Sequence, residues 1–185
     1  EDLLAIFRRS FKDSYRSFER YTFKKIGTKR DLHTKDWFFI QDIPDIYRQR
    51  IKTKYERLIS KAEKEILIET PYFLPGHNLR KRLCEAAQRG VNVVVITPIH
   101  SDVHVVDIVR RHYLGALHQA GVKLYFYTAG NLHAKGVMID QNTFSISSAN
   151  FDYRSFRYQY ELALIGKEPS LIPQLREHFD SSLKY

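Results

Sequence analysis

The segment from His133 to Asn150 carries side chains of the kinds that do chemistry on a phosphate group. Its sequence, HAKGVMIDQNTFSISSAN, places a histidine, a lysine, serines and an asparagine among residues typical of two strands joined by a tight turn. An imidazole can attack phosphorus or carry a proton near neutral pH, and ammonium, hydroxyl and carboxamide groups donate hydrogen bonds. Apolar residues would be easier to bury in such a hairpin, so the polar ones require an explanation.

Strand geometry predicts which of these side chains meet. Side chains alternate between the two faces of a strand, so His133 and Lys135 are expected on one face, about 6 to 7 Å apart. By the same alternation Ser148 and Asn150 share a face at the end of the second strand. The hairpin brings both ends together around one anion-sized space. Asp140 has the opposite parity and is expected in the turn, where its carboxylate can accept hydrogen bonds from backbone amides.

Glu161 interrupts the otherwise apolar stretch YELALI. An unpaired carboxylate buried there would be very unfavourable, so it needs a partner. Two alternatives remain open. It could bond one nitrogen of the candidate histidine and so select its tautomer, or it could form a structural salt bridge with an arginine such as Arg154 or Arg157.

The periodicity of apolar residues predicts the elements that position these groups. Residues 3–22 repeat large apolar residues every three or four positions and predict an amphipathic helix, residues 26–36 predict a loop, and a second helix is expected from Pro44 to about Lys64. Short strands then alternate with helices up to a closing helix over residues 170–183. This order predicts an α/β fold, with a mixed, largely parallel β-sheet flanked by helices on both faces.

Charge and composition further restrict the kinds of ligand and site that the chain could have. The formal net charge is +9, and residues 1–64 hold most of the surplus, with 17 Lys and Arg against 10 Asp and Glu. Such a surface favours phospholipid headgroups or nucleic acid, or is simply a solvated basic face. The single cysteine, Cys84, excludes an internal disulfide. We expect neither a membrane span nor a signal peptide, and a chain starting at Glu1 could be part of something longer.

The spacing of the polar residues resembles a known signature. His133, Lys135, Asp140, Ser148 and Asn150 match the pattern H-x-K-x4-D-x6-G-S-x-N of the phospholipase D superfamily, with a serine at position 147 in place of the glycine. The segments TPYFLPGHNLRKRLCEAAQRGVNVVVITP and ANFDYRSFRYQYEL further resemble the C-terminal half of cardiolipin synthases and related phosphatidyltransferases, over roughly residues 45–165. On this resemblance, residues 1–44 are expected to be an amphipathic helix and linker, which could be the tail of a preceding half. Residues 45–185 are expected to form a phospholipase D-like catalytic domain.

The resemblance implies a role for each residue of the motif. His133 is expected as nucleophile or general acid, Lys135 as a catalytic phosphate clamp and Glu161 as the group that orients the histidine. The remaining assignments are substrate-binding roles for Tyr72, Ser147, Ser148, Asn150 and Arg154, and structural roles for Asp140 and Asp152. No metal and no cofactor are implied.

The resemblance also implies partners. Members of the superfamily use two such motifs facing each other, whereas this chain has one; His33-Thr34-Lys35 copies the first three letters, but Asp36 follows directly. A second motif is therefore expected from a missing N-terminal half or from a homodimer. The expected substrate is a phospholipid, met at an anionic membrane surface, with the protein peripheral to a membrane or cytoplasmic. The alternatives are a nuclease acting on nucleic acid, and a phosphate-recognising half without activity of its own.

Overall fold

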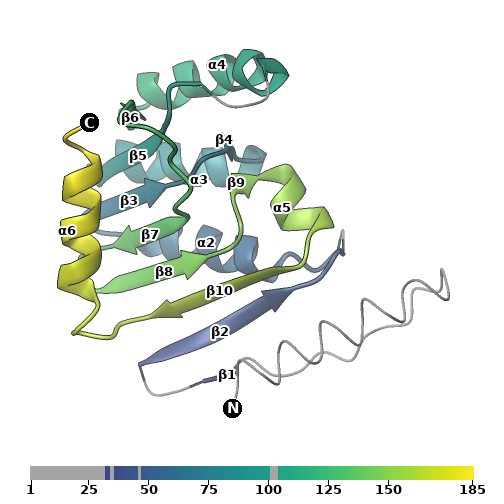
Figure 1. Cartoon of the computed structure of the whole chain (residues 1–185), viewed down its shortest axis with the longest axis vertical. Coiled ribbons are helices and arrows are strands. Elements are labelled where there is room, and N and C mark those ends of the chain that lie inside the picture. Colours follow the sequence, from purple (N-terminus) through teal and green to yellow (C-terminus); the bar gives the residue numbers. More distant parts are fainter. Residues whose placement is uncertain (1–31, 34–35, 46, 101–103) are drawn as a thin grey trace, which may run out of the picture. The chain divides into compact units, whose positions relative to one another are not determined.

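The computed structural model describes residues 32–33, 36–45, 47–100 and 104–185, and the helix expected over residues 3–22 lies outside this part (Figure 1). Its elements, in chain order, are β1 (Leu32–His33), β2 (Trp37–Asp42), α2 (Arg50–Lys61), β3 (Glu65–Glu69), β4 (Phe73–Leu74), α3 (His77–Gln88), β5 (Asn92–Pro98), α4 (His104–Gln119), β6 (Lys123–Tyr127), β7 (Gly136–Ile139), β8 (Thr143–Ser147), β9 (Phe151–Asp152), α5 (Tyr153–Tyr158), β10 (Glu161–Gly166) and α6 (Ile172–Ser182).

Eight strands form one mixed sheet in the order β1-β2-β10-β8-β7-β3-β5-β6. The alternating strands and helices after α2 give the parallel neighbours β3, β5 and β6, as the order of elements predicted. The pairs β3–β7, β7–β8, β8–β10 and β10–β2 are antiparallel. The mixed α/β sheet is confirmed, but parallel pairing covers less of it than the sequence indicated, because the hairpin, β10 and β2 all add antiparallel strands.

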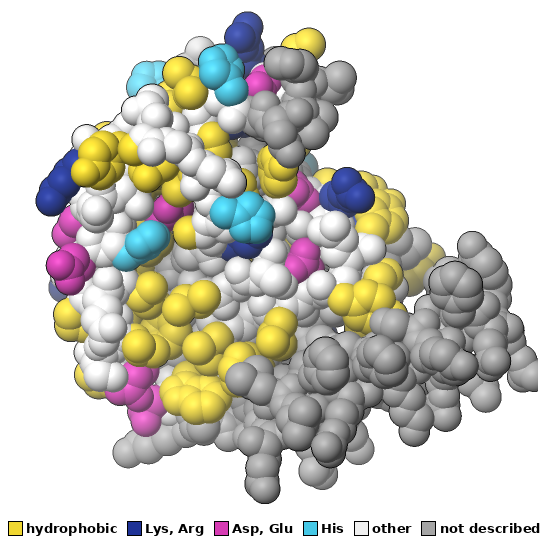
Figure 2. Space-filling model, viewed as in Figure 1, with side chains coloured by type: hydrophobic (Ala, Val, Ile, Leu, Met, Phe, Trp, Pro, Cys, Tyr) yellow, Lys and Arg dark blue, Asp and Glu magenta, His cyan; other side chains and the backbone are white. Residues whose placement is uncertain are grey.

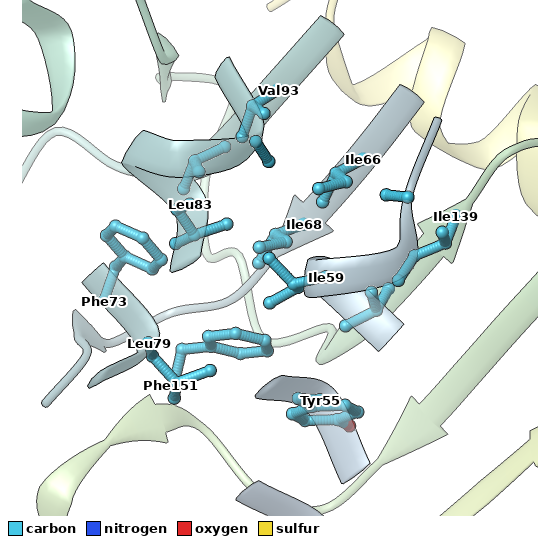
Figure 3. Packing of buried hydrophobic residues seen from close by; sticks show 14 of the residues in the cluster. Tyr55, Ile59, Ile66, Ile68, Phe73, Leu79, Leu83, Val93, Ile139 and Phe151 are labelled. Carbon is cyan, nitrogen blue, oxygen red and sulfur yellow. The ribbon is translucent and has the colours of Figure 1, made fainter. Parts of the chain in front are cut away.

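Helices cover both faces of the sheet. On one face α2 and α3 bury their apolar stripes against the sheet, where Ile59, Leu83 and Ile66 contribute to a continuous core (Figure 3). On the other face Phe179 of α6 packs with Leu67 and Met138. Each buried aliphatic or aromatic side chain of this kind contributes about 1.5 to 3 kcal/mol relative to its exposed state. None of the helices in the described ranges is long and apolar enough to cross a membrane.

Buried carboxylates attach α6 to β3. Glu69 is buried, and it accepts a hydrogen bond from Ser182 Oγ at 3.2 Å while His178 Nε2 lies 2.8 Å from its other oxygen. At the other end of the strand Arg176 forms an ion pair with Glu65. Charged groups inside a protein need such partners, so these contacts fix the position of the closing helix along the sheet.

The second helix starts later than predicted. It begins at Arg50 rather than near Pro44, because Asp42 accepts hydrogen bonds from the amides of Arg50 and Ile51 and so defines the first turn. The strand β2, which precedes it, was not predicted at all. The run Trp37 to Ile40 is rich in residues that favour strands, but it lacks the alternation that marks a strand with one solvent-facing side.

The hairpin of the motif is shorter than predicted, because β7 starts at Gly136 and the two residues of chemical interest precede it. Its turn is built by Asp140 and Gln141, both with positive φ (51° and 56°). The carboxylate of Asp140 accepts hydrogen bonds from the amides of Glu63, Lys64 and Glu65, with the shortest contact 2.7 Å. The aspartate thus fastens the turn to the loop between α2 and β3.

We expect Asp140→Ala to lower the free energy of unfolding by about 1 to 3 kcal/mol, because three amides, of which only that of Glu65 is partly buried, lose a charged acceptor and alanine disfavours positive φ. Asp140→Asn is the matched control. Asparagine tolerates the same backbone conformation and keeps one acceptor oxygen, so its loss should be clearly smaller. Urea denaturation measures both; an alanine variant as stable as the wild type would contradict this role of the carboxylate.

Candidate active site

His133 and Lys135 lie in the extended segment immediately before β7. The Nζ atom of Lys135 is 3.3 Å from Nδ1 and 3.4 Å from Nε2 of His133, and it donates to the His133 carbonyl oxygen at 2.7 Å. The imidazole is exposed and the ammonium is partly buried. The lysine therefore holds the histidine backbone in place while the ring stays accessible to a substrate.

Ser148 follows the last residue of β8 and lies beside β10. Its amide donates to the Leu162 carbonyl oxygen at 2.9 Å, and its Oγ accepts from the Leu162 amide at 3.0 Å. The same hydroxyl donates to Oε2 of Glu161. The structure therefore connects the two ends of the motif with a carboxylate from β10, a strand that comes later in the chain.

Neither partner proposed for Glu161 from the sequence is the one observed. Among the described residues its hydrogen-bond partners are the hydroxyls of Ser148 and Ser155, and neither His133 nor an arginine is among them. Arg157 instead lies over the ring of Tyr153, 4.3 Å from the ring centre. The role of Glu161 in orienting the imidazole therefore remains a prediction, and the salt bridge to Arg154 or Arg157 is not formed.

Burial dominates the electrostatics of this cluster. It raises the pKa of Glu161, and the hydrogen bond from Ser148 and the charge of Lys135 oppose that effect. Burial also lowers the pKa of Lys135, against the stabilising charges of Glu161 and Asp152. The charges of Glu161 and Asp152 thus affect the pKa of Lys135, and the charge of Lys135 affects that of Glu161. The three groups therefore lie near the same site. Figure 2 shows histidine, basic and acidic side chains together near the middle of one face.

The backbone from position 147 to Asn150 is held in a compact turn. Ser147, at the position of the signature glycine, accepts from the Ala149 amide at 2.9 Å and donates to the Leu162 carbonyl oxygen at 3.3 Å. Next along the chain, Oδ1 of Asn150 is buried and has no hydrogen-bond partner among the described residues. An unsatisfied buried amide oxygen is costly, so this atom is suited to a ligand or partner that donates a hydrogen bond.

Two further contacts fix the chain beyond Asn150. The Phe151 amide donates to Oγ1 of Thr70 at 3.2 Å, and Phe151 pairs with Phe73 in the short parallel sheet β4–β9. Asp152 caps α5 by accepting from the Ser155 amide at 2.6 Å. The contact through Thr70 was not predicted, and only its position at the end of β3 could have suggested it.

Tyr72 precedes β4, and Arg154 lies in α5, which follows β9. Arg154 is exposed on α5, and Tyr72 is partly buried before β4, where its carbonyl oxygen accepts from Thr70. A cavity of about 310 Å³ lies beside α5 between the first turns of α2 and α3, lined among others by Lys52, Asn78 and Arg157. It contains none of the predicted site residues, so substrate roles for Tyr72 and Arg154 stay predictions.

Curated relatives of this chain include cardiolipin synthases. The chain is 35% identical over 141 residues to a cardiolipin synthase of Clostridium perfringens, which covers 76% of this chain and 30% of that protein. It is 36% identical to a cardiolipin synthase of Oceanobacillus iheyensis, over 76% of this chain and 29% of that protein. The chain thus spans about three tenths of the length of these curated relatives.

Solved structures share the fold at low sequence identity. The phospholipase D family member Nuc from Salmonella typhimurium superimposes with a TM-score of 0.64 at 20% identity, covering 78% of this chain and 93% of Nuc. A phosphatidylserine synthase from Haemophilus influenzae gives a TM-score of 0.62 at 16% identity, covering 76% of this chain and 37% of that one. The family model described as "Cardiolipin synthase, PLD-like domain" matches residues 55–183. With the fold, the motif and this match in agreement, the chain belongs to the phospholipase D superfamily, in the cardiolipin synthase-like family.

Proposed function

We propose that the chain catalyses transfer of a phosphatidyl group between phospholipids through a covalent intermediate on His133. The observation that supports this proposal is that Lys135 Nζ lies 3.3 Å from the exposed imidazole of His133, while the backbone joins the two ends of the motif through the Ser147 amide, which donates to the Lys135 carbonyl oxygen at 3.0 Å. Membership of the cardiolipin synthase-like family supports the phospholipid as the substrate class.

The reaction proceeds in two displacements. A ring nitrogen of His133 attacks phosphorus, the bond from phosphorus to the leaving alcohol oxygen breaks, and that oxygen takes a proton from the histidine of a second motif. An acceptor hydroxyl then attacks the phosphohistidine, its proton goes to the same second histidine, and the phosphorus–nitrogen bond breaks. Transfer to water in place of the acceptor alcohol gives hydrolysis. Lys135, Ser148 and Asn150 stabilise the charge on the phosphoryl oxygens in both steps.

The second motif comes from outside the described part of this chain. Relatives more than three times as long as the matched region support a preceding half as its source, and a second copy of the chain is the alternative. The exposed position of His133 is what such a partner requires, because the other histidine has to approach the same phosphorus. Tyr72, Ser147 and Arg154 are assigned to substrate binding around this shared site.

His133→Ala should abolish phosphatidyl transfer, by on the order of a thousandfold or more, because the nucleophile is removed. Radiolabelled phosphatidylglycerol in mixed micelles provides the substrate, and acid-labile label on the protein reports the intermediate. His118→Ala, an exposed histidine on α4, serves as the matched control and should stay active. Near-normal turnover in folded His133→Ala would contradict the mechanism, and a wild-type chain with neither turnover nor label would favour a phosphate-recognising half.

Lys135→Ala should reduce turnover by about a hundredfold or more, because one charge-stabilising donor is lost. The pKa of Lys135 is lowered by burial, so the wild-type enzyme should lose activity as the pH rises through that lowered value, below the usual range for lysine. Lys135→Arg keeps its charge at high pH and should lack this decline, whatever its maximal rate. An identical alkaline decline in Lys135→Arg would exclude the ammonium as its cause.

The substrate class is tested by assaying a phospholipid and a plasmid with the same preparation. We expect turnover of phosphatidylglycerol, and at most weak nicking of supercoiled plasmid, from the same preparation. The His133→Ala preparation controls for contaminating nucleases and lipases. Plasmid nicking that is faster than lipid turnover, and that disappears in His133→Ala, would replace the phospholipid with nucleic acid as the substrate while leaving the chemistry intact.

A further inference from the structure

The cavity beside α5 is lined by cations and hydrogen-bond donors that the proposed reaction does not use. It has a volume of about 310 Å³ and lies where α5 meets the N-terminal turns of α2 and α3, which Figure 1 shows in the same part of the fold. Its charged lining residues are Lys52 and Arg157, and none of the described residues that line it is acidic. Binding sites for small molecules begin at about this volume, so a small polar ligand would fit.

The guanidinium of Arg157 is held by aromatic groups and not by a carboxylate of the described residues. Its Nη1 donates to the hydroxyl of Tyr153, and the guanidinium carbon lies 4.3 Å from the centre of the same ring. The Tyr158 hydroxyl is a further hydrogen-bond partner. A guanidinium has five N–H donors in one plane, so donors remain when the tyrosines are bonded. A half-buried, stacked arginine without a counter-ion is suited to bind two oxygens of a phosphate.

Lys52 brings a second cation that already has a partial counter-ion. Its Nζ lies 3.0 Å from Oε1 of Glu56, one turn further along α2. An ammonium group has three N–H donors, so one carboxylate oxygen leaves others for a ligand. Because Lys52 and Glu56 largely cancel each other's charge, Arg157 supplies most of the net charge of the cavity. That balance suits the single negative charge of a phosphodiester.

The start of α3 favours an anion at the same place. The N-cap residue Gly76 has no side chain that could bond the first amides, and the first turn of this helix contains no acidic residue. Free amides and the helix dipole together favour negative charge there. His77 and Asn78, both exposed, add an imidazole and a carboxamide that can bond ligand hydroxyls. Phe156 is the only aliphatic or phenyl side chain in the lining, which is too little apolar surface for an acyl chain.

We propose that this cavity binds a phosphodiester with a small hydroxylated substituent, at a site separate from His133. The headgroup of a glycerophospholipid and a soluble glycerophosphodiester share this chemistry. The inference goes beyond the proposed function and does not depend on it, because none of the groups that carry it belongs to the motif. Helix α5 contacts both places, since its buried Ser155 bonds Glu161 while Arg157 lines the cavity.

The test follows the two sites separately in samples of the whole chain. Nuclear magnetic resonance signals of the Asn78 carboxamide and the Arg157 guanidinium report the cavity, and those of the His133 imidazole report the catalytic site. Glycerophosphoglycerol is the probe, and glycerol, which lacks the charge, is its control. We expect the diester to shift the Asn78 and Arg157 signals with a dissociation constant below about 10 mM, and glycerol to leave them in place.

Arg157→Gln should weaken binding at the cavity, followed at Asn78, by about tenfold or more, because the charged donor is lost. Arg48→Gln is the matched control. It removes an equal charge from an exposed residue just before α2 that does not line the cavity, so at physiological salt the affinity should stay within about twofold.

Gly76→Asp tests the charge preference without changing Arg157. A Cβ at Gly76 meets nothing within 4 Å, and the backbone there is extended, with φ −61° and ψ 167°, so a side chain fits. Aspartate and asparagine are both favoured N-cap residues, so Gly76→Asp and Gly76→Asn should fold equally well. The aspartate should repel the diester and bind it about tenfold or more weakly than the asparagine variant does.

Short-chain phosphatidylglycerol, used below its critical micelle concentration, distinguishes the two sources of the ligand. Binding at least as tight as that of glycerophosphoglycerol assigns the cavity to a lipid headgroup. Binding of the deacylated diester alone assigns it to a soluble phosphodiester.

The remaining outcomes are distinct. Equal shifts with glycerol and with the diester overturn the proposal, as do equal affinities of Gly76→Asp and Gly76→Asn or a dissociation constant above about 10 mM. Shifts at His133 without shifts at Asn78 and Arg157 overturn it while leaving the proposed function intact. Shifts at Asn78 and Arg157 without any at His133 support the cavity and contradict the phosphate clamp of the proposed function instead.

Discussion

The position of β10 between β8 and β2 is the constraint on which the site depends. One edge of β10 brings Glu161 and Leu162 to Ser148, and its other edge brings Glu161 opposite Asp42. Strand β10 thus connects Ser148, at the end of the motif hairpin, with Asp42 of β2. Because sheet hydrogen bonds fix this register, a slip by one residue would turn Glu161 to the other face and leave Ser148 without its partner.

The two ends of the β7–β8 hairpin have different physical functions. At the turn, Asp140 satisfies a row of amides before β3 and holds the hairpin against the rest of the sheet. At the open end, polar groups remain accessible, and Asn150 keeps a buried oxygen without a partner in the described structure. Asp140 therefore stabilises the fold, while His133 and Lys135 of the same motif are the groups proposed to meet the substrate. Rigid attachment at one end preorganises the groups at the other.

Helix α2 contacts both the central sheet and the residue that follows Asn150. Tyr55 of α2 donates or accepts a hydrogen bond with Ser145 of β8 at 3.0 Å, and its ring stacks on Phe151 at 5.0 Å between ring centres (Figure 3). Phe151 directly follows Asn150, so α2 supports the clamp as well as the core. Asp42, which accepts hydrogen bonds from the first amides of the same helix, therefore supports the site through the position of α2. A buried polar group reduces stability unless it is paired. Such groups are therefore expected mainly where function requires them.

The sequence alone determined the chemical groups, their hairpin and most of the sheet. The spacing from His133 to Asn150 is local, and one tight turn is enough to bring the backbone of its two ends together, whereas the clustering of their side chains stays a prediction. The parallel strands β3, β5 and β6 and the helices between them also follow from local periodicity. The strand β2, the later start of α2 and the partners of Glu161 did not. Each depends on which strand lies beside β10, and that pairing joins segments far apart in the chain. Only the folded sheet decides it, because backbone hydrogen bonds between distant strands carry no local signal in the residues that make them.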